Sequence, residues 1–247
     1  METERHKLQM DLLIYPLKPW LARQPEGGYV NGNMFVYFSL AQVRDQDFRG
    51  PDVFVVLGVP RRERKSWVVW EEGKGPDVVI ELLSETTATD DKGRKKRIYQ
   101  DRLKVAEYYW FDPFDPDDWA GFALCHGVYQ PLLPDDRGRL LSRQLDLALV
   151  RWHGVYAEVE ATWLRWATLG GELLPTEREL LESETQRVAE ATRQVVEATQ
   201  RAEVEARRAE VEARRAEAQA RRAEVAEAEL ARLRALLASQ GTAGTGQ

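Results

Sequence analysis

Cysteine is almost missing from this sequence of 247 residues, which contains one, Cys125. A lone thiol can build neither a disulfide framework nor a zinc site made of several cysteines. Chains that lack a disulfide framework are typical of reducing compartments, so we expect a cytoplasmic protein.

Long apolar runs are missing too. The best apolar stretch near the start, residues 12–15, is far shorter than a membrane span and follows a segment of mixed charge. A signal peptide has instead a basic start and a longer apolar core. The sequence therefore predicts neither a membrane protein nor an exported one.

The sequence also lacks an excess of basic residues. Its 35 Lys and Arg against 41 Asp and Glu give a formal net charge of -6. Binding to phosphate groups needs Lys and Arg on the contact face, so any contact with nucleic acid must be confined to a local basic patch. Residues 61–65 and 92–97 are two basic clusters that could provide one, although either could instead be a solvated charged face.

Apolar residues make up 43% of the chain, which is enough for a packed core, but the composition is uneven. After about residue 175, aromatic residues, Lys and Gly give way to Ala, Glu and Arg. We predict a globular domain over residues 1–175, a long helical segment over 176–239 and a disordered tail over 240–247.

The predicted helical segment repeats every seven residues. An apolar residue stands at every seventh position from Leu181, and residues 201–221 consist of three near-copies of one heptad. This pattern predicts a coiled coil. The companion position, four residues on, carries Thr and Ala and then Glu227 and Arg234, so the seam is weak. Its partner, a second copy or another protein, is poorly specified, and a single exposed helix held by Glu–Arg pairs is the alternative.

The first 175 residues combine short strands with few helices. Apolar or aromatic runs predict strands over 34–38, 53–57, 78–83, 107–111, 121–124, 128–133 and 163–167. Helical patterns cover 5–15 and 89–103. The order strand, strand, helix, strand predicts an α/β (α+β) fold, in which helices flank a mixed β-sheet.

Two acidic residues stand in apolar strand segments. Asp52 opens the segment 53–57, and Glu81 lies inside the segment 78–83. A carboxylate among aliphatic side chains loses several kcal/mol of solvation unless a cation or a hydrogen-bonded partner compensates it. Two such acids on neighbouring strands can bind a hard cation such as Mg²⁺ through their oxygens, whereas a buried Glu paired with Arg or Lys is the structural alternative.

The next helix adds polar residues at regular steps. Asp91, Lys95 and Tyr99 recur every four residues, which places them on one helical face directly after the strand with Glu81. An ordinary Asp–Lys surface pair, with the tyrosine as packing, is the alternative interpretation.

Five motifs then occur in an order and spacing that resemble the Uma-type restriction endonuclease family. They are residues 50–56 (GPDVFVV), 67–73 (WVVWEEG), 81–84 (ELLS), 91–96 (DKGRKK) with Tyr99, and 107–113 (EYYWFDP). The similarity covers about residues 5–180 and includes the exit into a helical tail at 173–177.

This resemblance implies the PD-(D/E)XK nuclease fold. It implies that Asp52 and Glu81 are the acids of the site and ligate Mg²⁺ or Mn²⁺. The usual lysine of the superfamily, two residues after the second acid, is replaced here by Leu83. The resemblance places the corresponding lysine on the following helix, at Lys95, with Lys92 as an alternative.

Supporting roles follow from the same resemblance. Asp91 and Tyr99 would position Lys95, and Lys96 is a second alternative lysine. The superfamily often adds a polar residue from its first helix, for which Gln9 is the candidate.

We therefore predict a Mg²⁺-dependent DNA endonuclease that hydrolyses phosphodiester bonds and carries a C-terminal coiled coil. The rival hypothesis is an inactive descendant, in which the nuclease fold is a scaffold and the coiled coil binds other proteins. The net charge of -6 and Leu83 favour the rival, whereas the joint presence of Asp52, Glu81 and Lys95 favours the enzyme.

Overall fold

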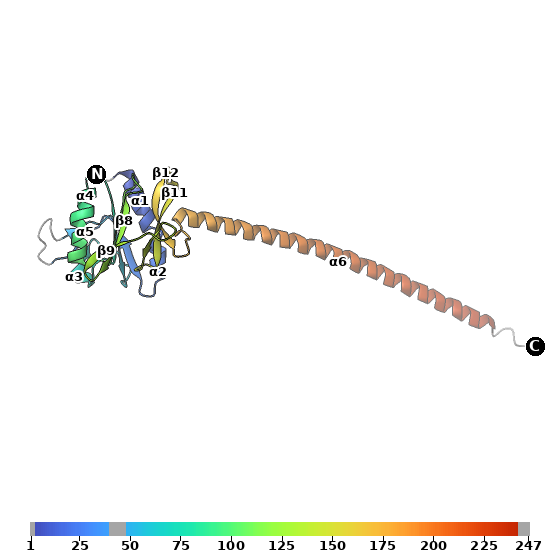
Figure 1. Ribbon diagram of the computed structural model, residues 1–247. Coiled ribbons are helices and arrows are strands. Elements are labelled where there is room, and N and C mark those ends of the chain that lie inside the picture. The colour runs from blue at the N-terminus through green and yellow to red at the C-terminus, as the bar shows by residue number, and fades with distance from the viewer. Residues whose placement is uncertain (1–2, 40–47, 242–247) are drawn as a thin grey trace, which may run out of the picture. The chain divides into compact units, whose positions relative to one another are not determined.

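The computed structural model describes residues 3–39 and 48–241, with side chains through Ala235 (Figure 1). The chain divides into two compact units, Met1–Leu181 and Glu182–Gln247. No helix in the described ranges combines the length and the apolar character needed to cross a bilayer.

A six-stranded sheet forms the centre of the first unit. Its strands, in spatial order, are β1 (Gly28–Asn31), β4 (Val53–Leu57), β6 (Val78–Leu82), β7 (Glu107–Phe111), β8 (Trp119–Cys125) and β9 (Val128–Leu132). The β6–β7 pair is parallel and the other neighbours in this sheet are antiparallel. The predicted mixed sheet is confirmed, and its central strands are the continuous apolar runs, as expected for strands covered on both faces.

The connection between the two parallel strands is helical, as predicted. It runs through α4 (Ala88–Asp90), η1 (Asp91–Lys95), α5 (Lys96–Ile98) and η2 (Tyr99–Leu103), where η marks π-helical turns. Lys104 ends it in the left-handed conformation, with φ of 53°. Such π-helical turns are rare and often occur at functional sites. This segment, called the crossover helix below, covers one face of the sheet, where Tyr99 packs in one apolar cluster with Phe54, Val79 and Tyr108.

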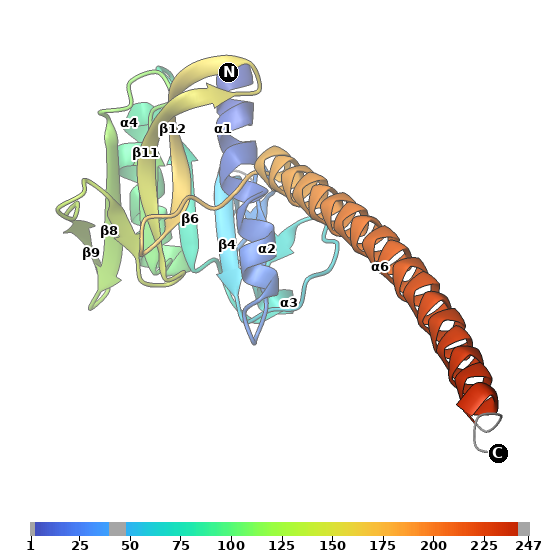
Figure 2. The same ribbon diagram turned by 90° about the vertical axis from the view of Figure 1, so that its right-hand side faces the viewer.

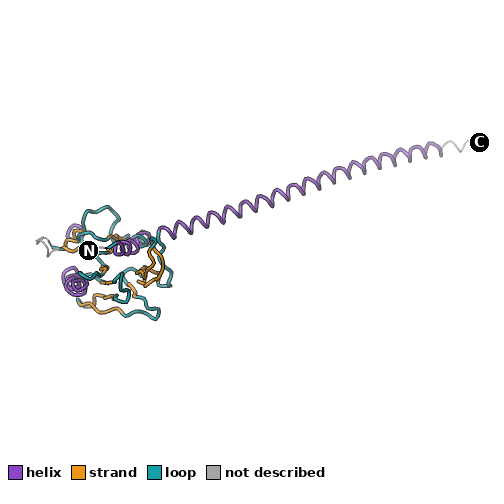
Figure 3. Tube along the Cα trace, turned by 90° about the horizontal axis from the view of Figure 1, so that it is seen from above, coloured by secondary structure: helices purple, strands orange, loops and turns teal. Residues whose placement is uncertain are grey.

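Other elements cover the opposite face (Figures 2 and 3). They are α1 (Glu4–Ile14), α2 (Leu17–Ala22) and an antiparallel sheet of β10 (Leu140–Ser142), β11 (Leu147–Tyr156) and β12 (Val159–Thr168). The helix predicted over 5–15 is confirmed as α1. Pro16 and Pro19 follow it but do not exclude helix: they occupy the N-cap and first turn of α2, where the missing N–H is tolerated.

A small sheet lies beside the main one. It contains β2 (Val36–Tyr37), β3 (Phe48–Arg49) and β5 (Trp67–Val68), and α3 (Val69–Glu72) follows directly. The strand predicted over 34–38 is therefore shorter than expected, with two residues in ladder pairing.

The C-terminal helix α6 extends over Glu177–Gly241, so it includes the first two residues of the segment predicted as a tail. Residues 242–247 lie outside the described range. A capping box starts the helix: the Glu179 amide donates to the Thr176 hydroxyl, and the Thr176 amide donates to the Glu179 carboxylate. The side chains of α6 are exposed from Glu177 through Ala235, and the coiled coil stays a prediction.

Candidate functional site

The two predicted acids lie side by side, Asp52 directly before β4 and Glu81 inside the neighbouring strand β6. Strands β4 and β6 pair with Val53 opposite Ile80, so the next positions in this register are Asp52 and Glu81. Side chains alternate along a strand, which puts both acids on the sheet face that the crossover helix covers. The Leu82 amide donates a hydrogen bond of 2.6 Å to Asp52 Oδ2 and fixes its carboxyl group.

The crossover helix brings its three predicted residues to these acids. Lys95 Nζ lies 3.2 Å from Glu81 Oε2 and 2.6 Å from Asp91 Oδ1. The Tyr99 hydroxyl donates to Glu81 Oε1 at 2.7 Å. The structure thus gathers Asp52, Glu81, Asp91, Lys95 and Tyr99 into one polar cluster, called the acid cluster below.

The acid cluster is almost closed to solvent. Glu81 is 0% exposed, and Asp91 and Tyr99 are each 1% exposed. The Lys95 side chain is 22% exposed and Asp52 is partly exposed, so these two residues connect the cluster with solvent.

Carboxylates outnumber the cation in this cluster. Burial, and then the charge of Asp52, raises the pKa of Glu81 well above its ordinary value. Burial also raises the pKa of Asp52, against the opposing effects of the Leu82 amide and Lys95. Burial alone would lower the pKa of Lys95, but the charges of Glu81 and Asp91 raise it overall, so its ammonium form persists at neutral pH. A further positive charge would therefore be stabilised among the acids.

The donor set fits a hard divalent cation. Both Asp91 oxygens are buried, and their one polar contact in the described structure is the ion pair of Oδ1 with Lys95 Nζ at 2.6 Å, which leaves Oδ2 without a partner. Within the described ranges, no three His, Cys, Asp or Glu side chains form a complete ligand group. Mg²⁺ typically binds through one or two carboxylates and completes its shell with water and substrate phosphate. Asp52 and Glu81 would be those two ligands.

Replacing Glu81 by Gln is expected to stabilise the metal-free protein at neutral and alkaline pH. Because folding raises the pKa of Glu81 above 4.5, the stability linked to this group is present below about pH 4.5 and is lost as the pH rises through the raised pKa. The melting temperature of the wild type in EDTA should therefore fall as the pH increases above about 5, and Glu81→Gln should reduce that fall.

Glu160 provides the matched control, since its side chain is 72% exposed on β12. Glu160→Gln should follow the wild-type melting profile. Parallel profiles for Glu81→Gln and the wild type would contradict the assigned electrostatics.

Two predicted supporting residues are not part of the acid cluster. Gln9 is fully buried and bonds to the backbone of Leu164, as donor at 2.8 Å and acceptor at 2.9 Å, on the opposite face of the main sheet. It joins α1 to β12, so the expected contribution of Gln9 to the site is wrong. Lys96 turns away along the sheet, with its Nζ 3.2 Å from the centre of the Phe122 ring.

The two basic clusters are largely tied up in local contacts. Arg62 and Arg64 both pair with Glu72, and Arg64 also lies over the Tyr29 and Trp67 rings. In the second cluster, Lys92 pairs with Asp118. Neither cluster as a whole forms a continuous free basic surface.

The sequence did not predict a role for one basic residue near the acids, Arg49. Arg49, in β3, precedes Asp52 by three positions, and burial and then the charge of Arg94 lower its pKa, against the charge of Asp90, so it lies near the crossover helix. The only signal in the sequence was this closeness to Asp52, because its helical neighbours lie more than forty residues away.

Comparisons with known proteins agree with the family expected from the motifs. Residues 1–153 match the family model described as "Uma2: Putative restriction endonuclease". A solved structure described as a putative nuclease belonging to DUF820 from Anabaena variabilis ATCC 29413 is similar, with 14% identity and a TM-score of 0.43. That similarity covers 59% of this chain and 75% of the other. Among curated proteins, none matches the sequence significantly.

Proposed function

Because the chain belongs to the Uma2 family of restriction-endonuclease-like proteins, we propose that it is a Mg²⁺-dependent or Mn²⁺-dependent endonuclease that hydrolyses phosphodiester bonds in DNA. The observation that carries the proposal is the acid cluster, in which the buried carboxylates of Glu81 and Asp91 pair with one ammonium group, that of Lys95, and the partly buried carboxylate of Asp52 lies beside them. Such a site has an excess of negative charge until a cation binds.

Each residue of the cluster has a defined part in the proposed reaction. A divalent metal held by Asp52 and Glu81 would supply Lewis-acid activation of the phosphate and of water. Lys95, protonated and partly exposed, would donate hydrogen bonds to the phosphate oxygens on which negative charge develops. Asp91 would hold the ammonium group in place by its ion pair, and Tyr99 would fix the orientation of Glu81 by its hydrogen bond.

Nicking of supercoiled plasmid tests the proposal directly. The wild type should convert the plasmid in Mg²⁺ or Mn²⁺ and not in EDTA, and calorimetry should detect metal binding by the same protein. Asp52→Ala and Glu81→Ala should lose both properties. Equal cleavage by the wild type and both variants would exclude this site as the catalytic centre.

The rival function is a scaffold without catalysis. Leu83 stands where the superfamily has its lysine, and the ammonium group that replaces it is already paired with Glu81 and Asp91. Metal binding without cleavage in the plasmid assay would favour this rival, in which the cation is structural and the protein works through α6.

We also propose that α6 associates with a second copy of the chain as a coiled coil. The apolar heptad positions are exposed in the single chain, including Leu181, Val188, Val195 and Leu230. Ion pairs between Glu197 and Arg201 and between Glu210 and Arg214 join successive turns of the helix. The small Ala residues of the middle heptads favour close approach of two helices and a weak association. The cytoplasm remains the expected location, on account of the scarcity of cysteine.

Removing the second unit is expected to abolish self-association. The full chain should sediment as a dimer, whereas a chain that ends at Leu181 should sediment as a monomer. Ending there preserves the ion pair of Arg165 Nη2 with Glu179 Oε2, at 2.7 Å, and the capping box of α6. A double substitution, Val188→Lys with Val195→Lys, should have the same effect in the full chain.

Gln186→Lys is the control, since residue 186 lies on the other side of the helix from Val188. It should leave the dimer intact. A full chain that sediments as a monomer at all concentrations would contradict the coiled coil.

A further inference from the structure

Arg49 contains a buried donor that lacks an acceptor. Its Nε is shielded from solvent and has no hydrogen-bond partner. One terminal nitrogen, Nη1, donates to the carbonyl of the adjacent Phe48 at 2.5 Å. Among the described residues, no carboxylate forms an ion pair with this guanidinium group. Buried polar groups without partners are rare in folded proteins, and an ion or ligand that is not present is one explanation.

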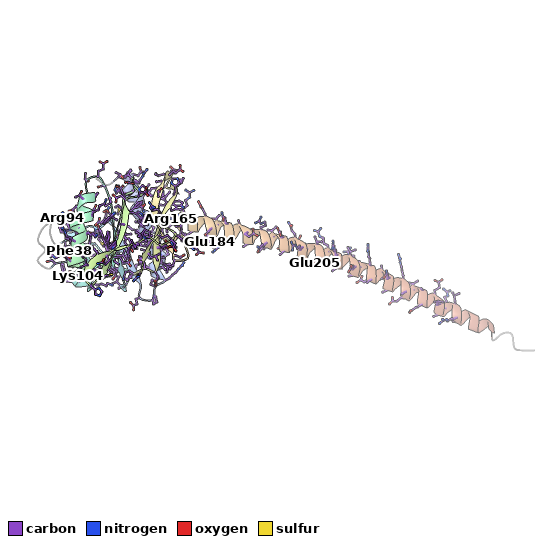
Figure 4. All side chains as sticks on the ribbon, viewed as in Figure 1. Phe38, Arg94, Lys104, Arg165, Glu184 and Glu205 are labelled. Atoms are coloured by element: carbon purple, nitrogen blue, oxygen red, sulfur yellow. The ribbon has the colours of Figure 1, made fainter. Side chains whose placement is uncertain are left out.

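Two other arginines lie close enough to Arg49 to affect its pKa. Burial lowers its pKa first, and the charges of Arg94 and Arg102 lower it further, against Tyr99 and Asp90. Asp90 is not available as a partner, because Arg94 binds both of its oxygens, at 2.7 and 3.2 Å. Figure 4 labels Arg94 and Phe38 on this side of the domain, and Arg102 lies over the Phe38 ring at 5.1 Å. A guanidinium group here would be stabilised by an anion.

This place is close to the acid cluster. Arg49 and Asp52 are three residues apart, which limits the distance between their Cα atoms to about 10 Å. Tyr99, which lies near enough to Arg49 to affect its pKa, donates a hydrogen bond directly to Glu81. Neighbouring charges on one strand of DNA rise by about 3.4 Å along the helix axis, so a phosphate one or two nucleotides away from the acid cluster comes within reach of Arg49.

We propose that Arg49 binds a backbone phosphate of the substrate, next to the phosphate that the acid cluster receives. The inference rests on the proposed nuclease function and adds a binding residue to it. The planar guanidinium group suits phosphate because two parallel N–H groups can donate to two of its oxygens. A phosphate would also provide the acceptor that Nε lacks.

The test compares three variants of the full-length protein: Arg49→Met, Arg49→Lys and the control Arg23→Met. Arg23 is exposed and follows α2, on the opposite face of the main sheet. The measurement is the Kd for a short fluorescent DNA duplex in Ca²⁺, which should permit binding without cleavage, over a range of salt concentrations. Arg49→Met should raise the Kd about tenfold and reduce the salt slope by about one. Arg49→Lys should fall between Arg49→Met and the wild type, because Lys keeps the charge but not the paired donors.

An Arg49→Met affinity equal to that of the wild type, or a loss no greater than that of Arg23→Met, would overturn the inference, as would a wild type that binds no duplex. Should Arg49→Met fail to fold, Arg49→Lys decides: weaker binding at an unchanged melting temperature supports the phosphate contact, and unchanged binding refutes it. Failure of the nuclease proposal can be distinguished from failure of this inference. If cleavage does not depend on Asp52 while Arg49→Met still weakens binding, the phosphate site stands and the catalytic assignment falls.

Discussion

Asp52→Asn is expected to reduce metal-dependent cleavage about a thousandfold, because it removes one of the two anionic ligands that we propose for the metal. The substitution keeps the size of the side chain and an oxygen that can accept from the Leu82 amide, at 2.6 Å in the wild type. It also removes the repulsion between Asp52 and Glu81, which raises the pKa of Glu81 after burial. The metal-free variant should therefore melt at a higher temperature than the wild type while it loses activity.

This opposite response separates a metal site from a structural one. If the carboxylate of Asp52 only supported the fold, its replacement by the neutral Asn side chain would lower the stability of the protein. Activity should be measured as plasmid nicking and stability as thermal melting in EDTA, on the same preparations.

Asp77 offers a closely matched control. It accepts a hydrogen bond of 2.6 Å from the Leu57 amide, so it makes the same kind of contact between β4 and β6 at the other end of the strand pair. Asp77 forms an ion pair with Lys74, and in the described structure it has no hydrogen bond or ion pair with a residue of the acid cluster. Asp77→Asn should leave cleavage within about twofold of the wild type and should not raise the melting temperature. Full activity of Asp52→Asn would contradict the catalytic assignment.

Glu107→Ala is expected to have the largest effect on stability, a loss of about 3–5 kcal/mol in the free energy of unfolding. Glu107 is 2% exposed at the start of β7 and accepts four hydrogen bonds. The donors are the hydroxyls of Tyr109 (3.0 Å) and Ser142 (2.5 Å) and the amides of Arg143 (2.7 Å) and Gln144 (3.2 Å). Alanine would leave all of them without their acceptor between the main sheet and the β10–β11 connection.

Urea denaturation at neutral pH measures this loss. Glu107→Gln, which retains one oxygen acceptor, should lose less than alanine does. Glu160→Ala, on the exposed part of β12, should change the free energy of unfolding by less than about 0.5 kcal/mol. A loss below about 1 kcal/mol for Glu107→Ala would show that the four donors find other acceptors or water.

The sequence was most informative where local pattern and tertiary environment agree. Residues 53–57 are apolar throughout, residues 108–111 are all aromatic, and both runs lie in central strands; the crossover helix appears where its pattern predicted it. The spacing of Asp91, Lys95 and Tyr99 was sufficient to place them on one face. Their meeting with Asp52 and Glu81 depends on strand register, which the family resemblance supplied and the periodicity did not.

The local sequence pattern did not predict other features of the structure. The long strand β11 was not predicted, because Arg151, His153 and Gly154 interrupt its apolar pattern and its outer half is partly exposed. Gln9 was assigned to the site because its helix position was known but the face that α1 covers was not. Arg49 gave no periodic signal, since its environment is created by residues of a distant helix.

The crossover between β6 and β7 has a consequence for how such a site can be inherited. Glu81, Asp91, Lys95 and Tyr99 all belong to one strand–helix–strand unit, and Asp52 alone comes from outside it, from the position directly before β4. Residues 78–111 could thus be exchanged between related proteins as one cassette that already contains the ammonium group and its carboxylate partners. The recipient would need to supply one neighbouring strand with an aspartate directly before it at the matching register position, and the rest of the domain could then diverge widely while these five side chains still meet.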